Sequence, residues 1–412
     1  MPSRRAILAA LGLGVAQFAG CGGRQSNTTT HSNTSTQSRT ATHSPTPSDT
    51  PTATPEETPR NVQCDRRWDQ RNVWTFGELQ EFSAIAAGPT AVYTATENAL
   101  FALEASTGQQ RWRTPNEPIA DSFHPSRLIV AGDWVLAVGR RHLVALDRTT
   151  GRQEWSFTAP GKEMTTSIME QAITVVGETV YAGVVNTDRP SFEPENPYSR
   201  IYAFDIATGT HRIVREFSPD SQFPRYLTGD KRGLYCAVGG RLIALADDGT
   251  TQWNSRGVDD EYSMSALSEG VVLASDGETM TAFDATTGQQ LWHDAALRGN
   301  VAVSDGVGYA TAKTIPEGNG QVTAFDPETG THYWEATTRG RGSPLALSSD
   351  AVFLSVTSSD GRFLTAFDSE RGCRLGSFDF SSDSSPPVVG AGRVSAISRS
   401  GGTDTLLSFK LP

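Results

Sequence analysis

Few residues in this 412-residue chain have types and spacing that could carry out chemistry. The densest acidic cluster is Asp259, Asp260 and Glu261, and three neighbouring carboxylates could coordinate calcium. A solvated turn is the alternative and the more common role of such a run. The 7 histidines show no metal-ligand spacing such as HxxxH, and there is no GxSxG, phosphate loop or CxxC motif. We therefore expect no catalytic residue, no metal site and no cofactor.

Three of the 4 cysteines, Cys64, Cys236 and Cys373, lie beyond the N-terminal segment. This odd number permits at most one internal disulfide among them. No histidine or asparagine context marks any of the three as a catalytic thiol. The function of the chain therefore has to be sought in how its elements are arranged.

One phrase recurs along the chain and indicates that arrangement. Residues 281–292 read TAFDATTGQQLW, and close copies occur at 101–112, 144–155 and 323–334. The turn glycines are spaced 39 to 58 residues apart: Gly108, Gly151, Gly209, Gly249, Gly288, Gly330 and Gly372. A period near 40 residues that contains only short strand-like runs is typical of a β-propeller.

Each unit repeats the same order of strands and turns. In the unit around Gly288, strands are expected at 271–275, 280–284 and 289–292. The aspartate before the turn can accept hydrogen bonds from backbone N–H groups two residues on, and the glycine tolerates a positive φ. No helix of ordinary length fits between the turns.

The two ends of the chain together supply an eighth unit. Residues 387–389, 393–398 and 405–409 read as three strands without an outer one, and 72–76 reads as a strand without a blade. Pairing them closes the ring and removes two exposed sheet edges. We therefore predict an all-β fold of eight four-stranded antiparallel blades over 61–412, the last closed by the N-terminal strand.

The repeated phrase, Ala-x-Asp-x-x-Thr-Gly-x-x-x-Trp, resembles the tryptophan-docking motif of quinoprotein-type (PQQ-like) β-propellers. The resemblance covers residues 68–412 and implies that each tryptophan packs on the neighbouring blade near its turn. Ile213 and Gly376 stand where two tryptophans are expected, which predicts weakness in the third and seventh blades. The docking residues are Trp112, Trp155, Trp253, Trp292 and Trp334, with Gly108, Gly151, Gly288 and Gly330 among the glycines of the turns.

The resemblance carries little information about activity. Quinoprotein alcohol dehydrogenases have adjacent cysteines, a carboxylate and asparagine metal set and a catalytic aspartate, whereas this chain is shorter and has no adjacent cysteines. It is more similar to the propeller lipoprotein of the outer-membrane β-barrel assembly machinery, which resembles it in having eight blades and no cofactor. That resemblance implies a scaffold role.

The N-terminal segment predicts export and lipidation. Arg4-Arg5 and the short apolar run 7–19 form a twin-arginine signal pattern over 1–20, and Cys21 ends a lipobox-like sequence. An ordinary cleaved signal with an incidental cysteine is the alternative. A lipidated Cys21 would anchor the protein to the extracytoplasmic face of the cell membrane.

Residues 21–60 read as a disordered stalk. The segment is rich in serine, threonine and proline and has almost no apolar residues, so it cannot bury enough surface to fold. Its two sequons, at Asn27 and Asn33, are candidate glycosylation sites. This signal and stalk resemble those of haloarchaeal surface proteins.

The formal charge of −11 and the pI of about 5.2 argue against nucleic acid as a partner, because phosphate binding needs clustered Lys and Arg. In a propeller, the loops between blades and those between the second and third strands share one face. The longest insertion, 186–198, falls there. A candidate binding face therefore comprises Phe192, Tyr198, Arg225, Tyr226, Asp260, Tyr262 and Arg341. Plain solvated loops are the alternative.

The expected blades also bring two cysteines near one another. Cys64 precedes the strand that completes the eighth blade, and Cys373 begins the outer strand of the seventh, so a disulfide between them would fix the entry of the chain. Cys236, in the fourth blade, is expected to be buried and free.

The sequence thus predicts a lipid-anchored, non-catalytic binding or scaffold module for an envelope protein or a surface ligand. The alternatives are a quinone- or metal-dependent dehydrogenase and the ligand-capturing ectodomain of an envelope system.

Overall fold

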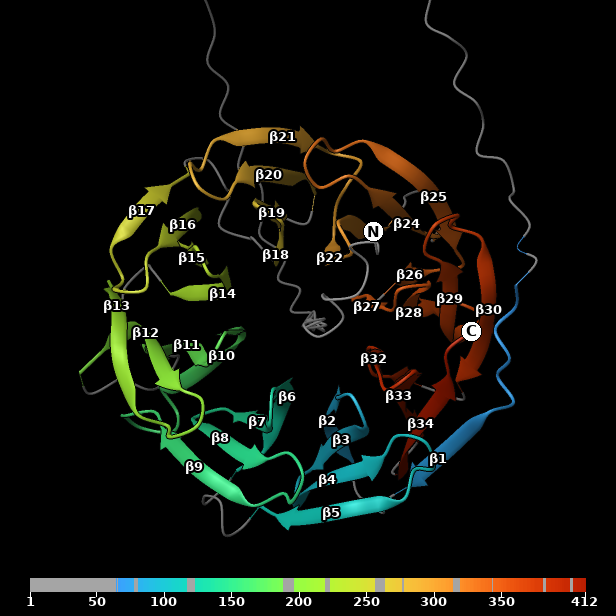
Figure 1. Ribbon diagram of the computed structural model, residues 1–412, viewed down its shortest axis with the longest axis horizontal. Helices are drawn as coiled ribbons and strands as arrows, with labels where there is room; N and C mark the ends of the chain where they lie inside the picture. The colour runs from blue at the N-terminus through green and yellow to red at the C-terminus, as the bar shows by residue number, and fades with distance from the viewer. Residues whose placement is uncertain are drawn as a thin grey trace, which may run out of the picture.

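The computed structural model describes most of the chain beyond the N-terminal segment. The described residues are 64, 66–77, 81–116, 123–187, 196–218, 223–255, 264–275, 278–313, 319–342, 344–380, 383–400 and 403–412. Cys21, Asn27 and Asn33 lie outside them. Within them the fold is a ring of eight antiparallel sheets arranged around a central axis (Figure 1).

The first four blades are formed by consecutive strands. Blade one comprises β2 (Phe82–Ala87), β3 (Ala91–Thr96), β4 (Ala99–Glu104) and β5 (Gln110–Pro115). Blade two comprises β6 (Pro125–Ala131), β7 (Trp134–Gly139), β8 (His142–Asp147) and β9 (Gln153–Thr158). Blade three comprises β10 (Thr166–Val176), β11 (Thr179–Asn186), β12 (Tyr198–Asp205) and β13 (His211–Phe217). Blade four comprises β14 (Pro224–Asp230), β15 (Gly233–Val238), β16 (Arg241–Leu245) and β17 (Thr251–Asn254).

Blades five and six are also formed by four consecutive strands, whereas the innermost strand of blades seven and eight is divided into two short strands. Blade five comprises β18 (Met264–Ser268), β19 (Val271–Ser275), β20 (Met280–Asp284) and β21 (Gln290–Asp294). Blade six comprises β22 (Asn300–Ser304), β23 (Val307–Lys313), β24 (Gly320–Phe325) and β25 (His332–Thr338). Blade seven comprises β26 (Arg341–Gly342), β27 (Ala346–Leu347), β28 (Ala351–Ser358), β29 (Gly361–Asp368) and β30 (Arg374–Phe380). Blade eight comprises β31 (Asp383–Ser384), β32 (Val388–Gly390), β33 (Arg393–Ser400), β34 (Thr403–Lys410) and β1 (Val73–Gly77).

Burial along the strands explains their composition. Every residue of β3 is buried, because the middle strands are covered on both faces by neighbouring blades. The outermost strand β25 instead alternates between more and less exposed residues, because only one of its faces meets another blade. The core is therefore a ring of interblade layers, and each layer depends on two consecutive repeats.

The N-terminal strand closes the ring as predicted. β1 pairs antiparallel with β34, from Val73 opposite Phe409 to Gly77 opposite Thr405. The buried guanidinium of Arg393 ties this pair together, donating to the backbone oxygen of Asn72 at 3.1 Å and to that of Ser408 at 2.7 Å. Both ends of the propeller domain are thus held in blade eight (Figure 1).

Tryptophan rings join most pairs of neighbouring blades. The ring of Trp253 covers Gly288 of the next blade, where a Cβ atom would lie only 2.5 Å from the ring. Its indole Nε1 donates to the backbone oxygen of Ala285 at 2.9 Å. The same ring-on-glycine contact and indole hydrogen bond recur at Trp74, Trp112, Trp155, Trp292 and Trp334. Trp74 of the closing strand makes this contact although its surrounding sequence lacks the repeated phrase.

The junction after blade three lacks a tryptophan and uses arginines instead. Ile213 is 43% exposed and contributes little to the interface. Arg212 donates to the backbone oxygen of Asp247 at 2.5 Å, and Arg215 donates to that of Gly249 at 3.2 Å. Arginine hydrogen bonds therefore take the place of the indole at this junction, beside an apolar layer that includes the buried Val214 and Leu245.

The junction after blade seven receives its tryptophan from the N-terminus. Trp68 packs edge-on against Phe353 of blade seven and Phe409 of blade eight, with ring centroids 5.7 and 5.3 Å away. Its Nε1 donates to the backbone oxygen of Lys410 at 2.9 Å. Gly376 leaves the space that this ring occupies. The weakness predicted for the seventh blade rested on a missing tryptophan, and Trp68, more than 300 residues away in the chain, fills that place.

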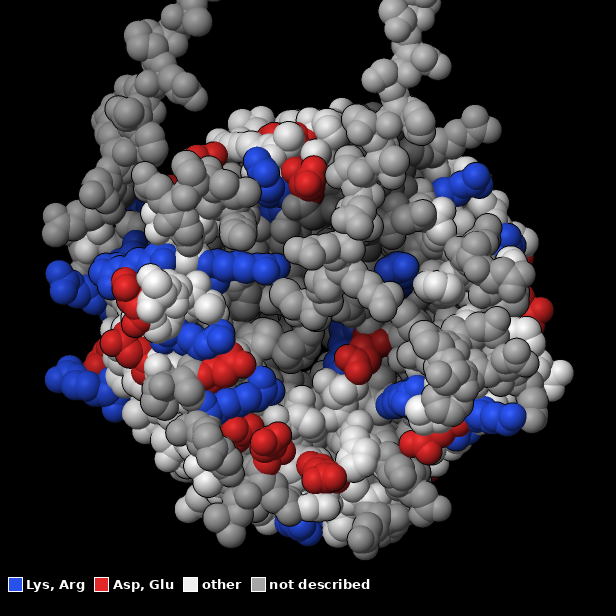
Figure 2. Space-filling view, turned by 180° about the vertical axis from the view of Figure 1, so that it is seen from behind, with Lys and Arg blue, Asp and Glu red and all other residues white. Residues whose placement is uncertain are grey.

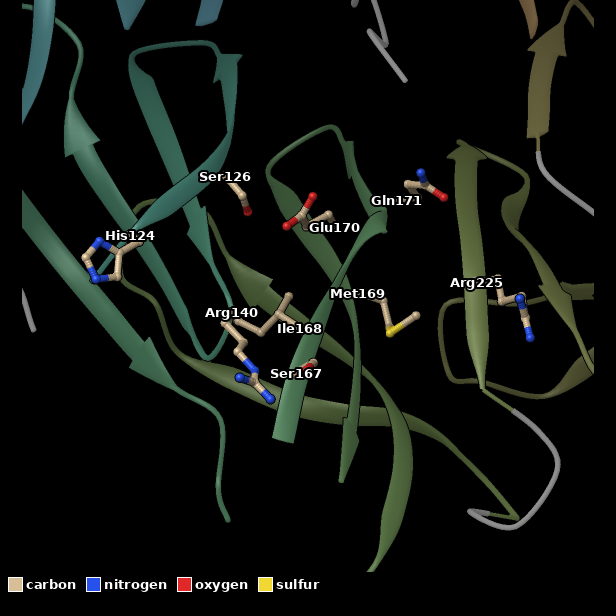
Figure 3. Close-up of a pocket in the computed structure, with 9 residues that line it drawn as sticks. All are labelled: His124, Ser126, Arg140, Ser167, Ile168, Met169, Glu170, Gln171 and Arg225. Atoms are coloured by element: carbon tan, nitrogen blue, oxygen red, sulfur yellow. The ribbon is translucent and has the colours of Figure 1, made fainter. Parts of the chain in front are cut away.

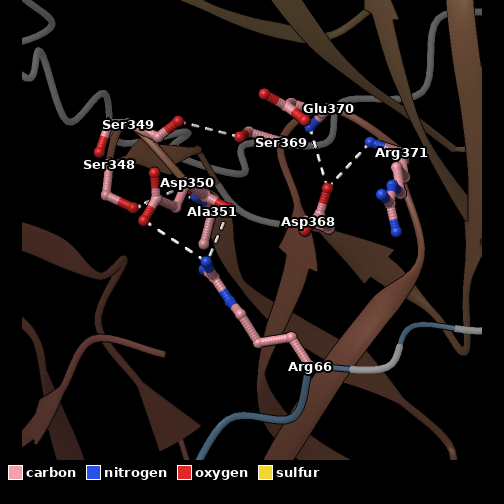
Figure 4. A network of polar contacts seen from close by, with 9 residues as sticks. All are labelled: Arg66, Ser348, Ser349, Asp350, Ala351, Asp368, Ser369, Glu370 and Arg371. Atoms are coloured by element: carbon pink, nitrogen blue, oxygen red, sulfur yellow. Dashed lines mark hydrogen bonds and ion pairs between the residues drawn. The ribbon is translucent and has the colours of Figure 1, made fainter.

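The segment that carries Trp68 is fastened at its start. Cys64 and Cys373 form a disulfide with Cα atoms 5.7 Å apart, and Cys236 is free and buried. Arg66 contacts the carboxylate of Asp350 at 3.4 Å, beside the turn at Asp368 (Figure 4). We call Cys64 and residues 66–72 the strap, and it enters the domain on the face that carries the turn glycines.

Candidate functional site

The two faces of the ring differ in construction. The turn face carries the turns between third and outer strands, including Gly288 and its equivalents. The cleft face, shown in Figure 2, carries the loops between blades and those between second and third strands. Basic and acidic side chains are intermingled there (Figure 2).

The turn face is regular. In most of the repeated turns an aspartate accepts hydrogen bonds from the residues that follow it, as where Asp284 accepts from the backbone N–H of Thr287 at 2.7 Å, and Glu104 takes this place in blade one. These bonds hold the pKa values of several turn carboxylates below their ordinary range, and at Asp147 the largest cause is the hydroxyl of Thr150. The same lowering occurs at Asp205, Asp248, Asp284 and Asp326. These carboxylates are committed to the backbone, which makes the turn face a structural surface.

The cleft face contains an open cleft of about 420 Å³ beside the inner strands of the ring. Its lining comes from three successive blades, from β6 across β10 to β14 (Figure 3). The lining residues are His124, Ser126, Arg140, Ser167, Ile168, Met169, Glu170, Gln171 and Arg225. A cleft of this size lies within the range of ligand sites, roughly 300–1,000 Å³.

An irregularity in β10 shapes the cleft. Ile168 is opposite Val184 and Ile173 is opposite Ala182, so four residues of β10 face only Gly183 of β11. The extra residues place Met169, Glu170 and Gln171 along the cleft (Figure 3). A bulge in an inner strand typically redirects side chains toward a site.

Two neighbours hold this bulge in place. The guanidinium of Arg127 on β6 donates to the backbone oxygen of Glu170, and burial lowers the pKa of Arg127 to about 10. Arg127 therefore keeps its charge at neutral pH. Gly183 provides the space, because a Cβ there would lie 2.8 Å from the Cβ of Ala172 and 2.7 Å from Pro224.

Basic side chains stand at both ends of the cleft. Arg140 is exposed and donates to the backbone oxygen of Met164 at 2.9 Å, and His124 lies at the same end. Arg225 is exposed at the other end, with its guanidinium carbon 5.5 Å from the ring centre of Phe223. Both arginines are thus oriented before any ligand arrives.

The residues predicted to form one binding face lie in different surroundings in the structure. Arg225 lines the cleft, and Tyr226 is half-buried beside it. Tyr198 is only 8% exposed, and its hydroxyl donates to the backbone oxygen of Pro160 at 2.6 Å, so it anchors β12 and offers little surface to a partner. Arg341 is exposed on β26, away from the cleft lining. Phe192, Asp260 and Tyr262 lie outside the described residues.

Sequence reasoning did not identify the β10 bulge or Arg140. It assigned the extra length of the third repeat to 186–198 alone, whereas β10 takes up part of it. The available signal was the break in alternation at Glu170-Gln171 within an otherwise apolar run. Arg140 lies in an ordinary tight turn whose sequence carries no mark of function.

The described residues do not supply a metal centre or a reactive thiol. No group of three His, Cys, Asp or Glu among them could hold a metal ion. Burial raises the pKa of the Cys236 thiol, and the other two described cysteines form the disulfide. The described part of the chain also contains no helix that is long and apolar enough to cross a membrane.

The ring, its closing strand and its docked tryptophans define a quinoprotein-type β-propeller. A family model described as outer membrane protein assembly factor BamB matches residues 64–213 and 275–402, which is more than half of the chain. The chain therefore belongs to this family. None of the curated proteins matches it as a relative.

Solved structures share the fold at low sequence identity. BamB from Moraxella catarrhalis is 18% identical, with a TM-score of 0.55 over 83% of this chain and 98% of that one. A europium-containing methanol dehydrogenase is 13% identical, with a TM-score of 0.57 over 82% of this chain and 92% of that one. Sqt1 from Saccharomyces cerevisiae is 12% identical, with a TM-score of 0.59 over 84% of this chain and all (100%) of that one. At such identities the similarity establishes the fold alone.

Proposed function

We propose that the protein is an extracytoplasmic, lipid-anchored propeller that binds a protein of the cell envelope through its cleft face and carries out no chemistry itself. The observation that supports this most is the cleft across blades two to four. Its basic ends and half-buried Met169 combine charge with apolar surface, as protein interfaces do. Membership of a family described as an assembly factor is in keeping with a scaffold role.

Crosslinking in living cells followed by affinity capture and mass spectrometry tests this proposal. The full-length protein is expected to retain one dominant envelope protein. The double variant Arg140→Ala and Arg225→Ala is expected to lose that partner. The variant Arg371→Ala is the matched control, because Arg371 is also exposed but lies on the turn face, and it should capture the partner normally. No partner above background in any sample would refute the proposal.

The membrane location is a proposal from the sequence. Cys21 would carry the lipid, and the stalk would hold the propeller away from the bilayer. The variant Cys21→Ser should move from the membrane fraction to the soluble extracytoplasmic fraction, whereas Cys236→Ser should remain in the membrane. A Cys21→Ser protein that stays in the membrane would contradict this anchor.

The second candidate function is a quinone-dependent dehydrogenase, favoured by the similarity of the fold to a europium-containing methanol dehydrogenase. Titration of the full-length protein with pyrroloquinoline quinone, together with calcium or a lanthanide, tests it. Stoichiometric uptake would support the enzyme and count against the scaffold. Saturable binding of a sugar or small metabolite would instead support a ligand-capturing ectodomain.

A further inference from the structure

The positions of the charged side chains in the cleft indicate which kind of ligand it would bind. Arg140 and His124 lie at one end and Arg225 at the other, while the half-buried Met169 supplies apolar surface between them (Figure 3). Building on the proposed function, we propose that the cleft binds an extended acidic segment of the partner protein, in which two carboxylate side chains flank an apolar residue.

Each end of the cleft is prepared for a carboxylate. Arginine pairs with carboxylates through a planar fork of N–H donors, and these pairs are strongest where the guanidinium is already oriented. Arg140 is oriented by its bond to the backbone of Met164, and Arg225 by the ring of Phe223. The two arginines stand on different blades, so a ligand that contacts both has to extend across the cleft.

The centre of the cleft suits an apolar side chain and a peptide backbone. Met169 is half-buried against the core of blades three and four, and its flexible thioether adapts to varied apolar partners. The half-buried Glu170 brings a carboxylate to the same stretch. A carboxylate there disfavours a uniformly acidic ligand and can accept hydrogen bonds from the N–H groups of an extended backbone.

The bulge makes this arrangement rigid. The backbone of Glu170 is held by Arg127 from the neighbouring blade, and Ala172 is fully buried behind it. The apolar and acidic centre of the cleft is therefore fixed relative to β6, and ligand binding need not order it. A rigid site of this kind loses little entropy on binding.

Fluorescence anisotropy with synthetic peptides tests the inference on the full-length protein. The probe is a fluorescein-labelled Gly-Asp-Leu-Asp-Gly peptide. The first control replaces both aspartates with lysine, and the second replaces the leucine with glycine. The aspartate–leucine probe is expected to bind at least about tenfold more tightly than either control, and more weakly as salt is added.

Protein variants locate the binding. Arg140→Ala and Arg225→Ala together should weaken binding of the probe by at least about tenfold, and Met169→Gly should weaken it less, whereas Arg371→Ala should not change it. Equal binding of the three peptides, or displacement of the probe by free aspartate at the probe's own concentration, would overturn the inference. If the envelope partner is captured through Arg140 and Arg225 but the probe does not bind, the proposed function survives and this inference fails.

Discussion

The same strands connect the turn face and the cleft face, but the turn face carries repeated structural residues and the cleft face carries the residues that line the cleft. On the turn face, an aspartate, a glycine and a docked tryptophan recur, and each side chain already has a partner within the ring. On the cleft face, the exposed Arg140 and Arg225 come from different blades and line one cleft. Repetition therefore marks the residues that stabilise the ring, and the departure from repetition marks the residues available for binding.

The strap shows that one departure serves stability as well. Blade seven has Gly376 where most of the other turns lead to a tryptophan, and the chain restores the missing indole with Trp68. The strap enters on the turn face, so it reinforces the structural side of the comparison. Four predictions separate the two faces, beginning with the largest effect.

Removing the strap's indole should give the largest loss of stability. Trp68→Ala leaves a cavity between Phe353 and Phe409 and is expected to lower the free energy of unfolding by about 3–5 kcal/mol. Denaturant unfolding measures this. Binding by the fraction that remains folded should be unchanged, because the cleft lies on blades two to four. A loss below about 1 kcal/mol would show that the strap does not join the blades.

A substitution in a repeated turn should also lower the free energy of unfolding without affecting partner binding. Gly288 has φ of +71°, and a Cβ there would lie 2.5 Å from the ring of Trp253. Gly288→Ala therefore combines backbone strain with a clash and should cost about 2–5 kcal/mol. Gly306→Ala is the control, because its φ is +77° with nothing within 4 Å of the added Cβ. Equal losses for the two variants would show that the docked ring contributes nothing.

Arg127 is the residue expected to affect both properties. Arg127→Met keeps most of the side chain's bulk but removes the hydrogen bond to the backbone of Glu170. We expect a loss of about 1–3 kcal/mol in denaturant unfolding, together with weaker capture of the partner, because the bulge shifts. Arg152→Met on the turn face should change neither quantity. Normal capture by Arg127→Met would show that the bulge does not shape the binding site.

Acid should weaken the turn face by a smaller amount. The turn aspartates have pKa values below their usual 3.8 in the folded protein, so their contribution is present above that value. It is lost as the pH falls through the lower folded pKa. The melting temperature should therefore be steady above about pH 5 and fall below about pH 4. Asp147→Asn with Asp284→Asn should flatten that fall, and an unchanged fall would contradict the role of these carboxylates.

The fold was accessible from the sequence because its determinants are local and repeated. A phrase of about a dozen residues, such as Ala282–Trp292, contains the strand, the turn and the docking ring together. The closing strand could also be predicted, since a blade without an outer strand and a strand without a blade imply one another. That closure also suggested the pairing of Cys64 with Cys373 as a hypothesis, and the structure contains this disulfide.

The binding site was less accessible because it depends on contacts between distant residues. Tyr198 reads as an exposed aromatic anchor in the sequence, yet its hydroxyl reaches Pro160 and its ring is buried. Arg140 and Arg225 come together only through the curvature of the ring, and the β10 bulge depends on an arginine from another blade. No local pattern encodes such geometry. The role of Trp68 was not predicted for the same reason, because its contacts with Phe353 and Phe409 join residues far apart in the sequence.

The most direct test is to measure partner capture and unfolding in parallel for one variant of each face. The account predicts that Arg140→Ala with Arg225→Ala loses the crosslinked envelope partner and unfolds at the wild-type denaturant concentration. It predicts that Gly288→Ala unfolds earlier and still captures the partner. Capture that survives the double arginine variant, with loss only in proportion to the unfolded fraction of either protein, would contradict the assignment of binding to the cleft face.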